Sequence, residues 1–196
     1  MRARAVNPVK SMKTIFLIGY MGCGKSTLGR ALAARCDIEF IDLDDYIEAK
    51  AGKKIRDIFA DEGEAAFRKM ERDTLEEVSA KANTIVACGG GTPCFGDNME
   101  LMNARGLTVH LMASHGRLLE RLKRGRAKRP LIASLDDDSL DRFIHEQLNL
   151  RMPHYSKAAC TFDSSTLENE NEIEQKCSAF IREFNLPRKT SMESHD

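Results

Sequence analysis

An eight-residue glycine-rich loop, GYMGCGKS from Gly19 to Ser26, constrains this chain more than any other stretch of its sequence. The loop matches the pattern G-x-x-x-x-G-K-S/T, follows the apolar run Thr14–Gly19 and precedes a helical pattern that starts at Lys25. In this strand–loop–helix context, glycines let backbone N–H groups turn toward phosphate oxygens at a helix N-terminus that already favours anions. The sequence therefore predicts a site for the phosphates of a nucleotide.

Within this loop, several residue types have roles that follow from phosphate chemistry. Lys25 is expected to reach the β- and γ-phosphates, and Ser26 to ligate Mg²⁺ through its hydroxyl. The Cys23 side chain has no expected role beyond its small size. The expected phosphate contacts from this segment are Gly22, Cys23, Gly24, Lys25, Ser26 and Thr27.

Two carboxylates follow the second apolar run, in the sequence IDLDD from Ile41 to Asp45. Asp42 and Asp44 lie two positions apart, so in an extended segment they point to the same side. Carboxylates that leave a strand beside a phosphate loop could hold Mg²⁺, position an alcohol or cap the next helix. Their place beside the loop favours a functional role over capping alone.

The rest of the chain alternates short apolar runs with longer amphipathic stretches. The expected strands are Thr14–Gly19, Ile38–Leu43, Thr84–Cys88, Leu107–Met112 and the weaker Ala158–Phe162, and helical patterns start at Lys25, Asp44, Glu64, Asp97, Ser114, Asp136 and Asn169. This alternation predicts an α/β fold of three layers, with a five-stranded parallel sheet and helices on both faces. Ligands of such sheets bind at the carboxyl ends of the strands.

The length of 196 residues suits a single domain, which we expect at residues 13–186. Residues 1–12 are expected to be a disordered extension or a non-native start before Met12, and residues 187–196 a disordered tail. Thirty basic and thirty acidic side chains cancel, which argues against a nucleic-acid binder that relies on bulk charge. No apolar run reaches the length of a membrane span.

Six cysteines are scattered along the chain without a CxxC pair or a preceding signal peptide. This pattern predicts reduced thiols in a cytoplasmic protein. Cys88 and Cys94 flank a glycine triplet in ACGGGTPC, at a spacing that does not suit a zinc site, and no pair of histidines completes one.

A phosphate loop alone leaves several classes of nucleotide-binding protein open. A GTPase would need a guanine-reading N-K-x-D sequence, which the chain lacks. An ATP-driven motor would normally add an apolar strand that ends in aspartate, whereas the run TIVAC leads into glycines. A small metabolite or nucleotide kinase fits these observations best.

An ordered series of motifs between about Lys13 and Asp163 resembles shikimate kinase. The series is GYMGCGKST, FIDLDDYIE, IRDIFADEGEAAFRKMER, ACGGGTP, KRPLI and LRMPHYS. The pattern D-I-F-x-x-x-G-E-x-x-F-R-x-x-E, followed by the glycine triplet, is its most specific part. The resemblance implies a P-loop kinase of the nucleoside-monophosphate-kinase type, with a mobile lid at about residues 123–135.

The resemblance also implies roles on the acceptor side. Arg68 and Arg151 match positions that bind the shikimate carboxylate, and arginine forks bind carboxylates bidentately. Glu71 follows Arg68 by three residues on one helix face, so it can hold that guanidinium in place. Asp44 matches the carboxylate that grips two ring hydroxyls, including the one that is phosphorylated, and Asp42 matches a position in the Mg²⁺ shell.

Three further positions complete the implied site. Gly89, Gly90 and Gly91 follow the third strand, where a Cβ would collide with the bound ring and where Gly90 can donate its N–H. Arg129 matches the lid arginine that closes on the ATP phosphates. Arg121 is our choice for the adenine contact, although the segment after the last strand lacks the basic or proline residues that some relatives place there.

The implied reaction is the Mg²⁺-dependent transfer of a phosphoryl group from ATP to the 3-hydroxyl of shikimate. A cytoplasmic monomer that binds neither nucleic acid nor membrane is expected. Two alternatives remain at this point: a gluconate or other sugar-acid kinase, and a nucleotide-binding regulator without turnover. The complete acceptor set disfavours both, because a regulator needs no acceptor site and the motif series matches throughout.

Overall fold

The computed structural model describes residues 12–187 and residue 189 of the chain. Its strands are β1 (Thr14–Ile18), β2 (Glu39–Asp42), β3 (Thr84–Ala87), β4 (Gly106–Met112) and β5 (Cys160–Asp163). Its α-helices are α1 (Lys25–Cys36), α2 (Leu43–Ala51), α3 (Ile55–Ser79), α4 (Asn98–Arg105), α5 (His115–Arg124), α6 (Asp137–Tyr155) and α7 (Glu170–Glu183), and two 3₁₀ turns are Thr92–Cys94 and Arg126–Lys128. Most of the expectations for residues 1–12 and 187–196 fall outside the described residues.

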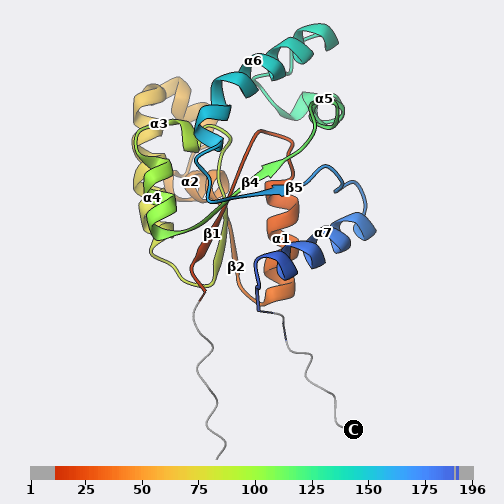
Figure 1. Cartoon of the computed structure of the whole chain (residues 1–196). Coiled ribbons are helices and arrows are strands. Elements are labelled where there is room, and N and C mark those ends of the chain that lie inside the picture. Colours follow the sequence, from red (N-terminus) through yellow and green to blue (C-terminus); the bar gives the residue numbers. More distant parts are fainter. Residues whose placement is uncertain (1–11, 188, 190–196) are drawn as a thin grey trace, which may run out of the picture.

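The five strands form one parallel sheet in the order β2-β3-β1-β4-β5, which confirms the predicted α/β fold. Every residue of β1 and of β3 is buried, because helices cover both faces of the sheet. In Figure 1, α3 and α4 lie on one side of the sheet and α1 and α7 on the other, while α5 and α6 stand beyond the carboxyl ends of the strands. The described part of the chain contains no helix that could span a membrane.

Most expected boundaries differ from the observed ones by no more than one residue, but two differ by more. The helical pattern expected from Glu64 captures only the second part of α3, which begins at Ile55 and is interrupted at Gly63, where φ is 81° and ψ 173°. The run expected as a strand from Ala158 begins instead at Cys160, because the backbone N–H of Ala158 closes a turn onto the carbonyl of Tyr155. These two differences arise where a kink, at Gly63, or a turn, before Cys160, interrupts the sequence pattern.

Candidate active site

The phosphate loop joins β1 to α1 at the carboxyl edge of the sheet. Gly19, Gly22 and Gly24 have φ values of 138°, 83° and 97°, which side chains with a Cβ rarely adopt, so these positions require glycine. The ammonium of Lys25 lies across the loop and donates to the carbonyl oxygens of Gly19 at 2.8 Å and Tyr20 at 3.0 Å. The loop thus has the strand–loop–helix geometry that its sequence predicts.

An open pocket of about 360 Å³ adjoins this loop. Its lining residues are Gly22, Gly24, Lys25, Ser26, Thr27, Arg121, Arg129, Leu167 and Glu168. The fold therefore brings Arg121 and Arg129, the two arginines that the sequence predicts for ATP, to the phosphate loop. Arg121 contacts Gly22 although the two residues are more than ninety positions apart in the sequence. Leu167 and Glu168 come from the segment after β5.

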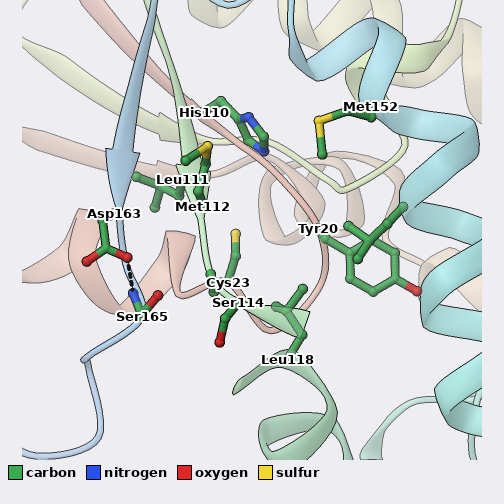
Figure 2. A pocket seen from close by; sticks show the side chains of 12 residues that line it. Tyr20, Cys23, His110, Leu111, Met112, Ser114, Leu118, Met152, Asp163 and Ser165 are labelled. Carbon is green, nitrogen blue, oxygen red and sulfur yellow. Dashed lines mark hydrogen bonds between the residues drawn. The ribbon is translucent and has the colours of Figure 1, made fainter. Parts of the chain in front are cut away.

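Cys23 points away from this pocket. Its side chain is buried and lines a second cavity of about 310 Å³ behind the loop, together with Tyr20, His110 and Met152 (Figure 2). Burial raises the pKa of Tyr20 to about 12 and lowers the pKa of His110 to about 4, so both rings are neutral near pH 7. The side chain of Cys23 therefore does not serve a phosphate, and its backbone N–H donates to the carbonyl oxygen of Tyr20 at 3.2 Å in this structure.

The two predicted carboxylates differ in their surroundings. Asp42 ends β2, and its Oδ2 accepts a hydrogen bond of 2.6 Å from the hydroxyl of Ser26. Asp42 also stands at the N-cap position of α2 without a side-chain capping bond, so capping does not account for it. Asp44 lies in the first turn of α2, where burial, and then the charges of Asp42 and Glu71, raise the pKa of its carboxyl to about 6.

The glycine triplet faces three side chains from three different helices. A Cβ added at Gly89 would lie 2.9 Å from Oδ1 of Asp44, and one added at Gly90 would lie 3.1 Å from Nη1 of Arg151. At Gly91 it would lie 3.4 Å from both terminal nitrogens of Arg68. The sequence led us to expect that a Cβ at these positions would collide with a bound ring. In the structure, such a Cβ would already crowd side chains of the protein itself. We call these six residues the acceptor cluster.

Arg68 is fixed from several sides. Its Nη1 donates to Glu71 at 2.8 Å, and its Nη2 to Glu64 at 3.1 Å. Its guanidinium also stacks on the ring of Phe95, 3.5 Å from the centroid. Glu71 is only 1% exposed and accepts a second hydrogen bond, of 2.5 Å, from the hydroxyl of Thr92. The pair Arg68–Glu71 is therefore part of a buried network, unlike a solvated surface pair.

Arg151 and the backbone of the triplet are held by α6. Nη2 of Arg151 donates to Oε1 of Gln147 at 2.9 Å, and its guanidinium lies over the ring of Tyr20 at 5.5 Å. Tyr155, one turn further along the same helix, donates its hydroxyl to the carbonyl oxygen of Gly90 at 2.6 Å. Side chains of α6 thus hold both Arg151 and the backbone of Gly90, which lies opposite it.

The segment expected as a lid, residues 123–135, joins α5 to α6. Arg129 is extended, with φ −127° and ψ 99°, because the proline that follows excludes the helical conformation. Its Nη1 donates to the carbonyl oxygen of Gly125 at 2.9 Å. Ile132 is fully buried and Arg126 binds the carbonyl oxygen of Leu135 at 2.8 Å, so the segment has more anchors than its polar sequence suggested.

Sequence reasoning missed several residues of this site: Thr92, Phe95, Tyr155, Leu167 and Glu168. Their roles depend on partners that are distant in sequence or lie across a turn. The departure of the segment after β5 from its relatives was a signal that pointed to Leu167 and Glu168.

A phosphate loop with its lysine, and beside it a glycine triplet that faces one carboxylate and two arginines, are the features of a P-loop phosphotransferase. Two arginines suit an acceptor that carries a negative charge. Asp44 lies close enough to Lys25 for the ammonium to offset part of the rise in the Asp44 pKa. The phosphate loop and the acceptor cluster are therefore adjacent.

Comparisons with known proteins agree with this class and narrow it. The family model for shikimate kinase matches residues 21–182. Shikimate kinases of Parabacteroides distasonis and Phocaeicola vulgatus are 43% and 44% identical to the chain, covering 87% and 89% of it and 99% of each relative. The crystal structure of shikimate kinase from Bacteroides thetaiotaomicron is similar with a TM-score of 0.86 and 42% identity, covering 89% of this chain and 99% of that one.

A second solved structure, shikimate kinase from Acinetobacter baumannii in complex with shikimate, has a TM-score of 0.75 and 30% identity over 89% of this chain and 94% of that one. The chain belongs to the shikimate kinase family, and it is an enzyme of the kinase class.

Proposed function

We propose that this enzyme transfers the γ-phosphoryl group of ATP to the 3-hydroxyl of shikimate, giving 3-phosphoshikimate and ADP. The observation that carries the proposal is the acceptor cluster, in which the glycine triplet faces Asp44, Arg151 and Arg68 in turn. One carboxylate beside two arginines suits an acceptor with hydroxyl groups at one end and a carboxylate at the other.

On the donor side, backbone N–H groups from Gly22 to Thr27 cradle the phosphates, and Lys25 moves from its loop carbonyls to the β- and γ-phosphates. Arg129 reaches the same phosphates from the lid, since it lines the pocket beside the loop. These cations neutralise charge as it spreads over the transferring group.

The residues present fit a Mg²⁺ ion. The hydroxyl of Ser26 and the carboxylate of Asp42 lie together at the start of α1, and both are hard oxygen ligands of the kind Mg²⁺ prefers. Within residues 12–187 no three His, Cys, Asp or Glu side chains are arranged as a metal site, which suits an ion held mainly by phosphates and water. Bound there, Mg²⁺ would supply charge neutralisation at the β- and γ-phosphate oxygens.

On the acceptor side, Arg68 and Arg151 bind the shikimate carboxylate and so fix the ring. Asp44 accepts a hydrogen bond from the 3-hydroxyl and aims its oxygen at the γ-phosphorus for in-line attack. A carboxyl with a pKa of about 6 is still too weak a base to ionise an alcohol beforehand. Asp44 therefore takes the proton late, as the new O–P bond forms.

ADP release should depend on shikimate. In a coupled assay with ATP and Mg²⁺, shikimate should support turnover, whereas gluconate and AMP should not. Turnover on gluconate with none on shikimate would replace the proposal by the sugar-acid alternative. ADP binding without turnover on any of the three would favour a regulator.

Replacing Arg68 by lysine should raise the shikimate KM by about tenfold or more, while the ATP KM changes little, because an ammonium cannot form the paired hydrogen bonds of a guanidinium. Steady-state kinetics with each substrate varied in turn provides the measurement. Lys69→Ala is a matched control, since the neighbouring Lys69 pairs with Asp73 on the exposed face of α3. An unchanged shikimate KM in Arg68→Lys would remove Arg68 from the site.

We also propose that the enzyme acts as a monomer in the cytoplasm. The acceptor cluster and the phosphate pocket are built from one chain, so no second copy is needed to complete them. Sedimentation at the enzyme's working concentration tests the monomeric state.

A further inference from the structure

Arg121 holds the phosphate loop to the far side of the nucleotide pocket. Its Nη1 donates to the carbonyl oxygen of Gly22 at 3.1 Å, and its Nη2 to the carbonyl oxygens of Ser164 at 3.2 Å and Ser165 at 3.1 Å. A single guanidinium thus joins the loop after β1 to the segment after β5. These bonds use three of the five N–H groups of the guanidinium, and the N–H on Nε is one of the two that remain.

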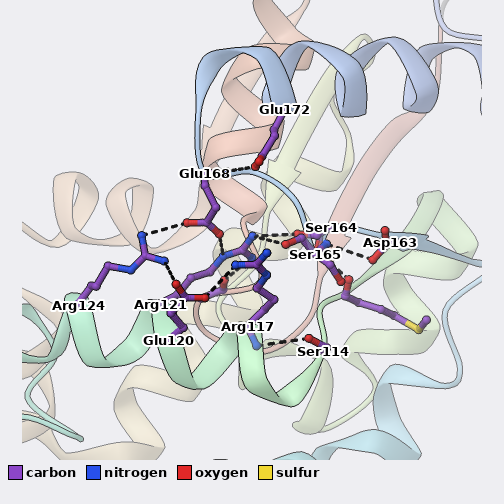
Figure 3. A network of polar contacts seen from close by, with 12 residues as sticks. Ser114, Arg117, Glu120, Arg121, Arg124, Asp163, Ser164, Ser165, Glu168 and Glu172 are labelled. Atoms are coloured by element: carbon purple, nitrogen blue, oxygen red, sulfur yellow. Dashed lines mark hydrogen bonds and ion pairs between the residues drawn. The ribbon is translucent and has the colours of Figure 1, made fainter.

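Glu168 supplies the partner of Nε. Its Oε1 accepts from Nε of Arg121 at 2.7 Å, and its Oε2 lies 3.3 Å from Nη1 of Arg124, one turn further along α5 (Figure 3). The two side chains of the closer pair are 12% and 23% exposed, so solvent screens this contact less than it would a surface pair.

Glu168 is itself held in place by the start of α7. Its backbone N–H donates to Oε2 of Glu172 at 2.7 Å, while the N–H of Glu172 donates to the capping side chain of Asn169 at 3.0 Å. Ser164 is fixed in turn, because its N–H and hydroxyl both donate to the carbonyl oxygen of Met112. The carboxylate therefore projects from a constrained segment, which is what a positioning group requires.

The charge of Glu168 is unexpected for its location. It lines the same pocket as Lys25 and Arg129, which must receive a polyanion. A carboxylate there repels phosphates unless its negative charge is offset, and hydrogen bonding to Arg121 holds the pKa of Glu168 below its usual range, so it stays ionised. Its presence calls for a compensating role.

We propose that Glu168 is a positioning residue for the nucleotide site. It fixes the guanidinium of Arg121 so that the phosphate loop and the wall contributed by Leu167 keep the spacing that a nucleotide needs. The inference rests on the proposed function only in taking the occupant of this pocket to be ATP or ADP; it does not depend on which acceptor is used.

Two possible roles for Glu168 predict opposite changes in nucleotide affinity when its carboxylate is removed. If it positions Arg121, removing the carboxylate weakens nucleotide binding. If it merely places a negative charge near the phosphates and competes for Arg121, removing it strengthens binding. The protein should still fold without the Glu168 carboxylate, because the three carbonyl groups that accept hydrogen bonds from Arg121 remain.

Calorimetric titration with ADP in the presence of Mg²⁺ tests the proposal. Glu168→Ala should weaken ADP binding about tenfold, as expected for one charge-assisted hydrogen bond. Glu168→Gln should stay within about threefold of the unsubstituted enzyme, because its amide oxygen can still accept from Nε. Glu120→Ala is the matched control, because the Glu120 carboxylate pairs with Arg117 and Arg124, whereas Arg121 pairs with Glu168. Its loss should change ADP affinity by less than about twofold.

Kinetics give a second measurement. Glu168→Ala should raise the ATP KM while kcat at saturating ATP and the shikimate KM stay nearly constant. Unchanged or tighter ADP binding in Glu168→Ala overturns the proposal. Equal weakening in the Ala and Gln variants also overturns it, because Gln keeps an acceptor for Nε and the hydrogen bond would then not be what maintains the site. If the unsubstituted protein binds ADP but does not turn over shikimate, the proposed reaction is contradicted. The role of Glu168 is then still decided by the ADP titrations. No ADP binding by the unsubstituted protein would contradict both.

Discussion

Replacing Asp44 by asparagine should nearly abolish turnover and at the same time make the folded protein more stable. The loss of activity should be on the order of 10²–10⁴-fold in kcat, the range that a positioned proton acceptor contributes. The amide of asparagine can still contact a hydroxyl, but it cannot take the proton. Shikimate binding should therefore fall much less than kcat.

The gain in stability follows from the pKa of Asp44. The carboxyl titrates at about 6 in the folded enzyme and near 3.8 in an unfolded chain, because burial and the neighbouring Asp42 and Glu71 disfavour its charged form. Folding therefore takes up a proton between these values, and the ionised group opposes folding above about pH 6. The penalty at pH 7 is on the order of 2–3 kcal/mol, and it is absent below the unfolded pKa.

Thermal unfolding without substrates or added divalent metal tests this expectation. At pH 7 the asparagine variant should melt roughly 5 °C above the unsubstituted enzyme, and the difference should shrink toward pH 4. Asp45→Asn is the matched control, since the Asp45 side chain is 71% exposed and only 3.5 Å from Arg30. A variant that is inactive and also less stable would show that Asp44 is a structural residue. Near-normal kcat would remove it from the mechanism.

Replacing Arg129 by alanine should lower kcat by about 10²-fold or more, with the shikimate KM changed little. Arg129 now donates to Gly125 but lines the pocket of Lys25, so a nucleotide offers its guanidinium a stronger, charged acceptor. Negative charge on the phosphoryl oxygens near Arg129 grows during transfer, so the arginine stabilises the transition state more than bound ATP. The substitution should therefore lower kcat. Lys25 shares this task, so the loss should fall at or below the lower end of the range for arginine fingers.

Arg142→Ala is the control for this variant, because it removes the same charge from an exposed position on α6 where the guanidinium contacts Ser139. Steady-state kcat and both KM values are the measurements. Arg129→Lys should recover part of the lost rate, since it restores a cation without the fork. A normal kcat in Arg129→Ala would mean that Arg129 takes no part in phosphoryl transfer.

Much of the donor side could be predicted because its signals are local. The phosphate loop needs glycines at positive φ, a lysine and a hydroxyl within eight consecutive residues, and all of these are visible in GYMGCGKS. The parallel sheet was equally clear, since strands buried on both faces read as continuous apolar runs. The larger boundary errors lie where a kink or a turn interrupts such a pattern, as at Gly63 within α3.

The acceptor residues that we propose could be named one by one from the motif series, but their arrangement could not. Sequence spacing does not reveal that Gly89, Gly90 and Gly91 each face a side chain from a different helix. It also assigns Asp44 an ordinary pKa, because the shift comes from burial and from the charges of Asp42 and Glu71, which only the packed structure brings together.

The sequence by itself therefore determined the class of fold and the phosphate loop, because periodicity, glycine conformation and motif spacing act over short stretches of chain. It also supplied the acceptor side chains that we propose. Only the tertiary structure decided how these groups are held. Arg121 and Glu168 are 47 positions apart and meet because α5 packs beside the segment after β5. Such contacts depend on helices and strands that pack together across the sheet, and no local pattern encodes them.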